Sequence, residues 1–201
     1  MKNTKLLIFG LLLMLSSFSC SNDDDGTNSN LPEITESGEN TFGCRIDGQV
    51  FVPRGSGGFS DGYTSILSAS YGRINYPEEQ EGYYLTISAR NRKTNKSIGI
   101  VLFKSDVPLA ENVTYPIELF EEGNFSADYR FADFNNSSEN SVPVYEYITN
   151  QEYNGTITIN KLDEQSNIVS GTFEFDCIDE SRELISTITE GRFDIIYEIL
   201  Y

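Results

Sequence analysis

The sequence contains no histidine and no tryptophan, and only three cysteines among its 201 residues. The missing histidines exclude Ser-His-Asp and Cys-His catalysis and every zinc or iron site that needs an imidazole ligand. The missing tryptophans remove the strongest stacking surface for a sugar or a quaternary ammonium ion. The remaining aromatic residues are 12 tyrosines and 13 phenylalanines, most of which we expect in the core.

Positive charge is also scarce. The chain has 14 Lys and Arg against 31 Asp and Glu, a net charge of −17. Binding to DNA or RNA needs Lys and Arg side chains that displace counterions from phosphates, so we expect no nucleic-acid partner. A strong negative charge is typical of a protein kept soluble by charge repulsion.

Long apolar runs are absent except near the N-terminus, where residues 6–15 read LLIFGLLLML after the basic Lys2 and Lys5. As a helix this run spans roughly 15 Å, about half the hydrocarbon thickness of a bilayer. The length, the basic start and the small residues that follow predict a signal peptide over residues 1–19.

Cys20 follows directly and resembles the lipidated cysteine of a bacterial lipobox, although Ser17 stands where leucine is commonest. Looser versions of this kind are usual in lipoproteins of Bacteroidota type. We therefore expect a lipid on Cys20 and anchoring to a membrane without a transmembrane helix. The alternative is an ordinary cleaved signal followed by a chance cysteine.

The residues after the cysteine resemble the surface-export signal of Bacteroidota lipoproteins: Ser21, Asn22, Asp23, Asp24 and Asp25. The resemblance implies a place on the outer face of the outer membrane. A solvated acidic linker would look the same, because like charges repel and keep a segment extended. Residues 20–39 are polar and predict a flexible tether.

From residue 40 onward, short alternating stretches recur between Gly, Asn, Asp and Pro clusters, which is typical of an all-β domain. Residues 83–90 are the clearest case, with every second side chain apolar. The run at residues 98–103 is apolar on both faces and predicts a central strand. About ten strands predict a single antiparallel β-sandwich over residues 40–201, with a closed up-and-down or calycin-like β-barrel as the alternative.

Three segments together resemble an uncharacterised family of Bacteroidota lipoproteins. They are residues 40–53, with TFGC, Asp47-Gly48 and VP; the hairpin of residues 155–175; and Gly191-Arg192-Phe193-Asp194. The resemblance implies a β domain at the cell surface and supplies no catalytic residues.

Cys44 and Cys177 remain once Cys20 carries lipid, and both fall in rows that we expect to face inward. An oxidising envelope favours a disulfide between them. Two separate buried thiols are the alternative.

Acidic residues offer the only enzymatic route. Glu174 and Asp176 share one outer face and could form an acid/base pair of glycosidase type, although such pairs arise by chance among 31 acids. No segment has the spacing of a calcium loop. We therefore expect no catalytic residues, no metal and no cofactor.

Exposed tyrosines are the candidates for ligand contact: Tyr76, Tyr84, Tyr145 and Tyr147. In a β domain such side chains more often pack on neighbouring strands. Three functions follow: a non-catalytic surface module that binds or scaffolds another surface component; a binding protein for an extracellular glycan or small hydrophobic ligand; and a carboxylate-dependent hydrolase. The oligomeric state is left open.

Overall fold

The computed structural model describes residues 30–55, 65–75, 77–138 and 141–201. Within these ranges the chain forms twelve strands, two 3-10 turns and no α-helix, so the all-β prediction is confirmed. The strands are β1 (Thr41–Ile46), β2 (Gln49–Phe51), β3 (Leu67–Ile74), β4 (Gly82–Asn91), β5 (Lys96–Ser105), β6 (Val113–Ile117), β7 (Phe125–Ala132), β8 (Val144–Ile148), β9 (Gly155–Asp163), β10 (Ile168–Asp179), β11 (Leu184–Ile196) and β12 (Glu198–Leu200).

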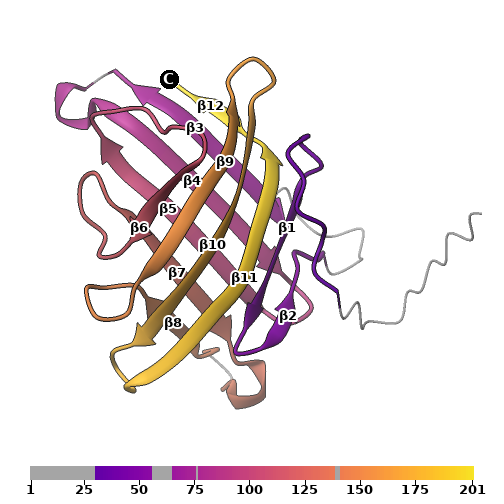
Figure 1. Cartoon of the computed structure of the whole chain (residues 1–201). Helices are drawn as coiled ribbons and strands as arrows, with labels where there is room; N and C mark the ends of the chain where they lie inside the picture. The colour runs from indigo at the N-terminus through magenta and orange to yellow at the C-terminus, as the bar shows by residue number, and fades with distance from the viewer. Residues whose placement is uncertain (1–29, 56–64, 76, 139–140) are drawn as a thin grey trace, which may run out of the picture.

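All twelve strands belong to one sheet, in the order β12-β3-β4-β5-β7-β6-β9-β10-β11-β1-β2, with β8 pairing with β7 and β10. Only Tyr197 separates β11 from β12, and β12 pairs in parallel with β3. Because β12 continues from β11 and pairs with β3, it closes the sheet by joining these two parts of it. Figure 1 shows the result: β6, β9, β10 and β11 cross in front of β3, β4, β5 and β7. Of the two architectures expected from the sequence, the connectivity is that of the closed one.

Alternation decides which side chains fill the space between the two halves of the sheet. In β4, Leu85, Ile87 and Ala89 are buried while the residues between them are more exposed. The β5 residues Ile98, Ile100 and Leu102 are buried in the same way, and β5 lies between β4 and β7 as expected of a central strand. These rows belong to one continuous apolar core.

Strand β11 and its continuation β12 pair with different strands along their length. Its residues 188–194 pair with β1, and the chain beyond Tyr197 pairs with β3. The β1–β2 hairpin thus lies beside β11 in the lower part of Figure 1, while β12 joins β3 at the top. This division leaves a seam between the hairpin and the start of β3. Among the residues described, none forms a helix with the length and apolar character needed to cross a bilayer.

A cavity between the hairpin and β3

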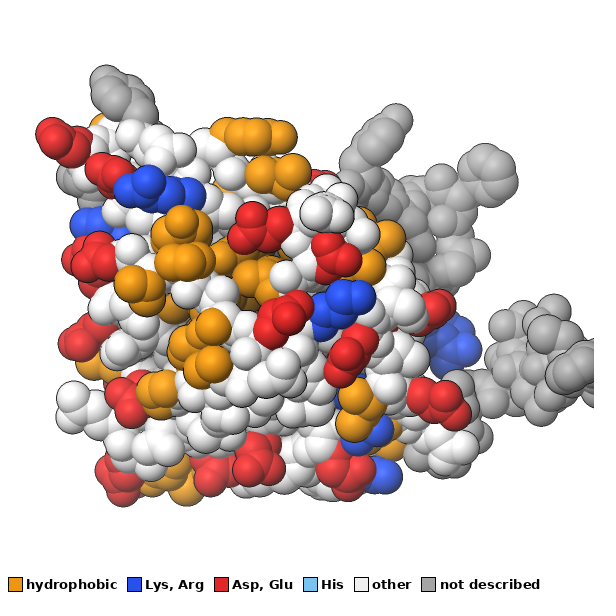
Figure 2. All heavy atoms as spheres, turned by 45° about the horizontal axis from the view of Figure 1, so that its top comes forward, with side chains coloured by type: hydrophobic (Ala, Val, Ile, Leu, Met, Phe, Trp, Pro, Cys, Tyr) orange, Lys and Arg blue, Asp and Glu red, His pale blue; other side chains and the backbone are white. Residues whose placement is uncertain are grey.

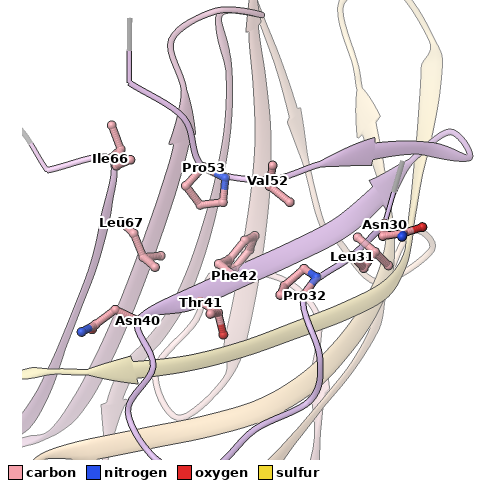
Figure 3. A pocket seen from close by; sticks show the side chains of 10 residues that line it. All are labelled: Asn30, Leu31, Pro32, Asn40, Thr41, Phe42, Val52, Pro53, Ile66 and Leu67. Atoms are coloured by element: carbon pink, nitrogen blue, oxygen red, sulfur yellow. The ribbon is translucent and has the colours of Figure 1, made fainter. Parts of the chain in front are cut away.

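A cavity of about 510 Å³ lies in this seam (Figure 3). Four stretches of chain line it: the segment before β1, β1 itself, the residues after β2, and the start of β3. The lining residues are Asn30, Leu31, Pro32, Asn40, Thr41, Phe42, Val52, Pro53, Ile66 and Leu67. Seven of these ten residues are apolar, and none is titratable. A cavity of this size is in the range of small-molecule sites.

The turn at Asp47 and Gly48 fixes the hairpin that forms one wall. Both residues have positive φ, 51° and 77°, as a tight two-residue turn between β1 and β2 requires. The carboxylate of Asp47 also accepts hydrogen bonds from the Thr187 amide, at 2.9 Å, and from the Ser186 hydroxyl, at 2.8 Å. These bonds tie the hairpin to β11, so the wall has a defined position relative to β3.

Phe42 provides the floor of the cavity. Its ring points toward Val52 and Pro53 in Figure 3 and is almost fully buried. Its ring centroid lies 5.3 Å from that of Phe173 in β10 and 6.2 Å from that of Phe51 in β2. Such aromatic pairs add to the energy of burial, so the floor belongs to the packed core. The side chains above it are only partly buried, as expected of cavity walls.

Pro32 closes the side nearest the N-terminus. It packs directly on Gly43 of β1, where an added Cβ would lie 2.5 Å from Pro32 Cδ, so only glycine permits this contact. The carbonyl of Pro32 accepts a hydrogen bond from the Arg192 guanidinium at 3.3 Å. The segment before β1 is therefore part of the site.

Asp194 fastens the same segment to β11. Its carboxylate accepts four hydrogen bonds, from the Thr35 hydroxyl at 2.7 Å and from the amides of Ser37, Gly38 and Glu39 at 2.8–3.1 Å. Burial raises the pKa of Asp194, but these hydrogen bonds outweigh it and the net pKa is lower than that of an ordinary aspartate. The carboxylate therefore stays charged at neutral pH.

The polar groups at the rim are few. Asn40 has a positive φ of 54°, and its Oδ1 accepts a hydrogen bond from the Ile196 amide at 3.0 Å. Its Nδ2 remains the group that it can offer to a ligand, together with the Thr41 hydroxyl and the Asn30 amide. A mostly apolar cavity with two or three neutral polar groups can bind and orient a small molecule, and none of the described residues that line it transfers protons near neutral pH.

Several predicted positions fall outside the described residues. They are the lipid site Cys20, the export signal at Ser21, Asn22, Asp23, Asp24 and Asp25, and Tyr76. The predicted domain start at residue 40 lies one residue before β1. Residues 30–39, which we expected in the tether, lie against the barrel wall through Pro32 and the hydrogen bonds to Asp194.

The other three candidate tyrosines lie apart from the cavity. Tyr84 donates a hydrogen bond to the Gln80 carbonyl at 2.9 Å and meets Phe103 edge-on at 5.9 Å. Tyr145 and Tyr147 instead pack under the guanidinium of Arg182, and their strand β8 lies at the lower end of the barrel in Figure 1. The three side chains thus contribute to the protein's own packing and are not brought together.

Cys44 and Cys177 are free thiols in the structure, so the predicted disulfide is wrong. Both are fully buried, as expected, but β1 and β10 lie on opposite sides of β11. Two strands that flank a third are roughly 10 Å apart, beyond the roughly 7 Å limit between the Cα atoms of a disulfide. Burial raises the pKa of both thiols, which leaves them protonated and unreactive.

The acidic pair also lies apart from the cavity. Glu174 and Asp176 are exposed on the outer face of β10. Within the part of the chain that the structure describes, no group of three or more Cys, Asp or Glu side chains has the geometry of a metal site.

The cavity itself was not predicted. Its walls come from residues 30–32, 40–42, 52–53 and 66–67, which no sequence pattern connects. The one available signal is the apolar pair Leu31-Pro32 within an otherwise polar stretch, since such a pair is unusual in a free tether.

Comparison with known families gives one match, to a domain of unknown function (DUF6252), over residues 78–196. The chain belongs to this family. The matched region contains the hairpin of residues 155–175 and the GRFD motif, while the hairpin of residues 40–53 precedes it. Searches of curated proteins and of solved structures returned no match.

The structure gives each residue of the segment Gly191-Arg192-Phe193-Asp194 a physical role. An added Cβ at Gly191 would lie 2.5 Å from the ring of Phe173, so the glycine makes room for that aromatic side chain. Arg192 binds the Pro32 carbonyl, Phe193 is buried in the core and Asp194 holds residues 35–39. The motif therefore joins the core to the segment that closes the cavity.

Proposed function

We propose that this member of the DUF6252 family is a lipid-anchored, non-catalytic binding protein at the cell surface, and that the cavity between the hairpin and β3 takes a small, mostly apolar ligand. The observation that carries the proposal is the cavity itself: about 510 Å³, with seven apolar residues and no titratable one among the described residues that line it. Burying apolar ligand surface there would contribute about 25 cal/mol per Å².

The charge of the protein restricts the class of ligand further. The chain carries a net charge of −17, and the described residues that line the cavity supply no cation to pair with an anionic ligand. An anionic ligand would meet an unfavourable long-range field, so a neutral or cationic ligand is favoured. The apolar lining favours a neutral one.

A hydrolase is the weaker candidate. Glu174 and Asp176 lie on an exposed outer face and line neither this cavity nor the smaller one described below. Carboxylate catalysis needs two acids facing each other across the substrate, about 5–10 Å apart. The buried, protonated thiols do not offer a nucleophile.

Binding can be tested with Nile red, a neutral dye whose fluorescence rises in apolar surroundings, added to a fragment of residues 30–201. We expect saturable binding of one dye molecule. Ile66→Glu places a charge in the wall, and Thr41→Trp fills the space with an apolar ring. Each should weaken binding at least tenfold, which corresponds to about 1.4 kcal/mol.

Val144→Glu is the matched control, because Val144 is an exposed apolar residue of β8 that does not line the cavity. It should leave the affinity unchanged. Equal dye binding by the wild type, Ile66→Glu and Thr41→Trp would contradict the proposed site.

The lipid anchor and the surface location are tested separately in cells. Cys20→Ser should release the chain from the membrane fraction, because it removes the thiol that accepts the lipid. Replacing Asp23, Asp24 and Asp25 with alanine should leave the chain anchored but protected from protease added to intact cells. Continued cleavage of that variant would show that the export signal lies elsewhere.

A further inference from the structure

A second, smaller cavity lies at the top end of the barrel as drawn in Figure 1, where β12 closes against β3. Its volume is about 300 Å³. Three tyrosines from separate segments line it: Tyr71 of β3, Tyr83 of β4, and Tyr197 between β11 and β12. Figure 2 brings this end forward and shows apolar and aromatic side chains near the middle of the face, with acidic side chains around them.

The tyrosine rings are held in place. Tyr71 and Tyr83 stack with their centroids 6.4 Å apart, and Tyr197 meets Tyr71 nearly at a right angle at 5.6 Å. The hydroxyl of Tyr71 accepts a hydrogen bond from the Leu109 amide at 3.2 Å. Two ring planes at a right angle form a rigid aromatic corner, so a ligand that enters meets a preformed surface.

Tyr71 and Tyr197 remain neutral over the physiological range. Burial raises the pKa of Tyr71 to about 12, with a smaller contribution from the nearby carboxylate of Glu164. Burial raises the pKa of Tyr197 as well. The corner therefore offers phenol rings and no phenolate charge.

The polar lining combines one positive, one negative and one neutral planar group. Arg73 lies 5.9 Å from the centre of the Tyr83 ring and is paired with Glu81. Glu164 and Asn167 enter from the turn between β9 and β10. Among the residues that the structure describes, no ion pair involves Glu164, so its carboxylate faces the cavity without a fixed counter-charge.

Each class of ligand can be compared with this lining. A purely apolar ligand would bury Arg73, Glu164 and Asn167 without hydrogen-bond partners, which costs free energy. An anion would be repelled by Glu164, and a cation would offer no hydrogen-bond acceptor to the guanidinium of Arg73, which is already paired with Glu81. An uncharged ring with several hydroxyl groups suits every part of this lining. Its C–H face can lie on an aromatic ring, and its hydroxyls can bond to the guanidinium of Arg73, the carboxylate of Glu164 and the amide of Asn167.

We propose that this end of the barrel is a binding site for one neutral saccharide ring, such as a terminal residue of a glycan. Tyr83 supplies the stacking face, because it is the least buried of the three tyrosines. Glu164 and Asn167 bind the hydroxyls from the turn above. This site is separate from the cavity at the hairpin and does not depend on the function proposed for it.

The experiment is saturation-transfer difference NMR on the purified full chain. The probes are the neutral methyl glycosides of glucose, galactose, mannose and N-acetylglucosamine, each at millimolar concentration. We expect transfer to at least one glycoside. Tyr83→Ala and Glu164→Gln should each weaken its binding at least tenfold, while the Nile red affinity at the hairpin cavity stays the same.

Two controls match these variants. Glu180→Gln makes the same charge change on the turn at the other end of β10, and Phe120→Ala removes an exposed aromatic ring away from the cavity. Both should bind as the wild type does. If Tyr83→Ala does not fold, Glu164→Gln decides alone, because Glu164 is an exposed turn residue.

No saturation transfer to any of the four glycosides would overturn the proposal, and so would wild-type affinity in Glu164→Gln. Tetramethylammonium serves as the cationic probe. Binding of this ion in place of the glycosides would also overturn the proposal, because it would identify the tyrosine corner as a cation site.

Discussion

The two ends of the barrel are built from the same kinds of residue but differ in what fills them. At the bottom, the guanidinium of Arg182 lies 3.6 Å from the centre of the Tyr145 ring and donates a hydrogen bond to the Tyr147 hydroxyl at 3.0 Å. Its Nε also pairs with Asp179 at 3.0 Å. The space beneath the tyrosines is therefore occupied by the protein itself.

At the top, the corresponding arginine lies farther from the tyrosine ring. Arg73 pairs with Glu81, close to it in sequence, and lies 5.9 Å from the centre of the Tyr83 ring. A space of about 300 Å³ is left beside the tyrosines. The two ends thus differ in how close the arginine lies to a tyrosine ring, 3.6 Å at the packed end and 5.9 Å at the hollow one.

The two ends should differ most in the free energy of unfolding that is lost when one tyrosine is removed from each. Tyr147 stacks on Tyr129 with centroids 5.2 Å apart and also holds Arg182, so Tyr147→Ala removes a packed ring and should lower the free energy of unfolding by about 3 kcal/mol. Tyr83 borders an existing cavity, so Tyr83→Ala should cost only about 1 kcal/mol. Urea unfolding at pH 7 measures both. Equal losses would mean that the top end is packed as tightly as the bottom.

The sequence predicts which way the side chains of a strand face better than it predicts which strands lie side by side. Alternation over residues 83–90 predicts the face on which each side chain of β4 lies, because a strand has a period of two. It also places Cys44 and Cys177 inward correctly. It does not say which strands are neighbours, and β11 lies between the two cysteines.

Strand ends and cavities were harder to predict for a related reason. β11 begins at Leu184, but the polar residues Ser186, Thr187 and Glu190 hide the alternation over its first half. Each cavity is lined by segments far apart in the sequence, so it depends on the closed topology and on no single motif.

A smaller loss of stability is expected from changing one of the two buried carboxylates, Asp179 and Asp194, which differ in what they bind. Asp179 bonds within its own turn, to Ser181 and Arg182, whereas Asp194 binds residues 35–39 from more than 150 positions away. Asp194→Asn removes the charge from these hydrogen bonds and should cost about 2 kcal/mol at pH 7. Asp176→Asn, the same change at an exposed position of β10, should cost close to nothing.

The pH dependence of Asp194 has a definite sign. Its pKa in the folded state is lower than the unfolded value of about 3.9, so folding favours the charged form. Its contribution to stability is fully present above pH 3.9 and is lost as the pH falls through the folded pKa. The difference between the wild type and Asp194→Asn should therefore be constant from pH 7 to about 4 and shrink below that. A difference that grows on acidification would contradict this role.

The smallest expected effect is that of a reductant on thermal stability. Because Cys44 and Cys177 are free thiols, packing and hydrogen bonds hold the hairpin to the barrel without a disulfide between them. The fragment of residues 30–201, denatured without reductant, should show two reactive thiols. Adding a reductant should leave its thermal midpoint unchanged. A disulfide closing a loop of this length would stabilise the fold by about 5 kcal/mol, so its reduction would lower the midpoint by many degrees. The absence of any shift would mean that strand pairing through β11, together with the bonds from Asp47 and Asp194, is enough to hold the wall of the larger cavity in place.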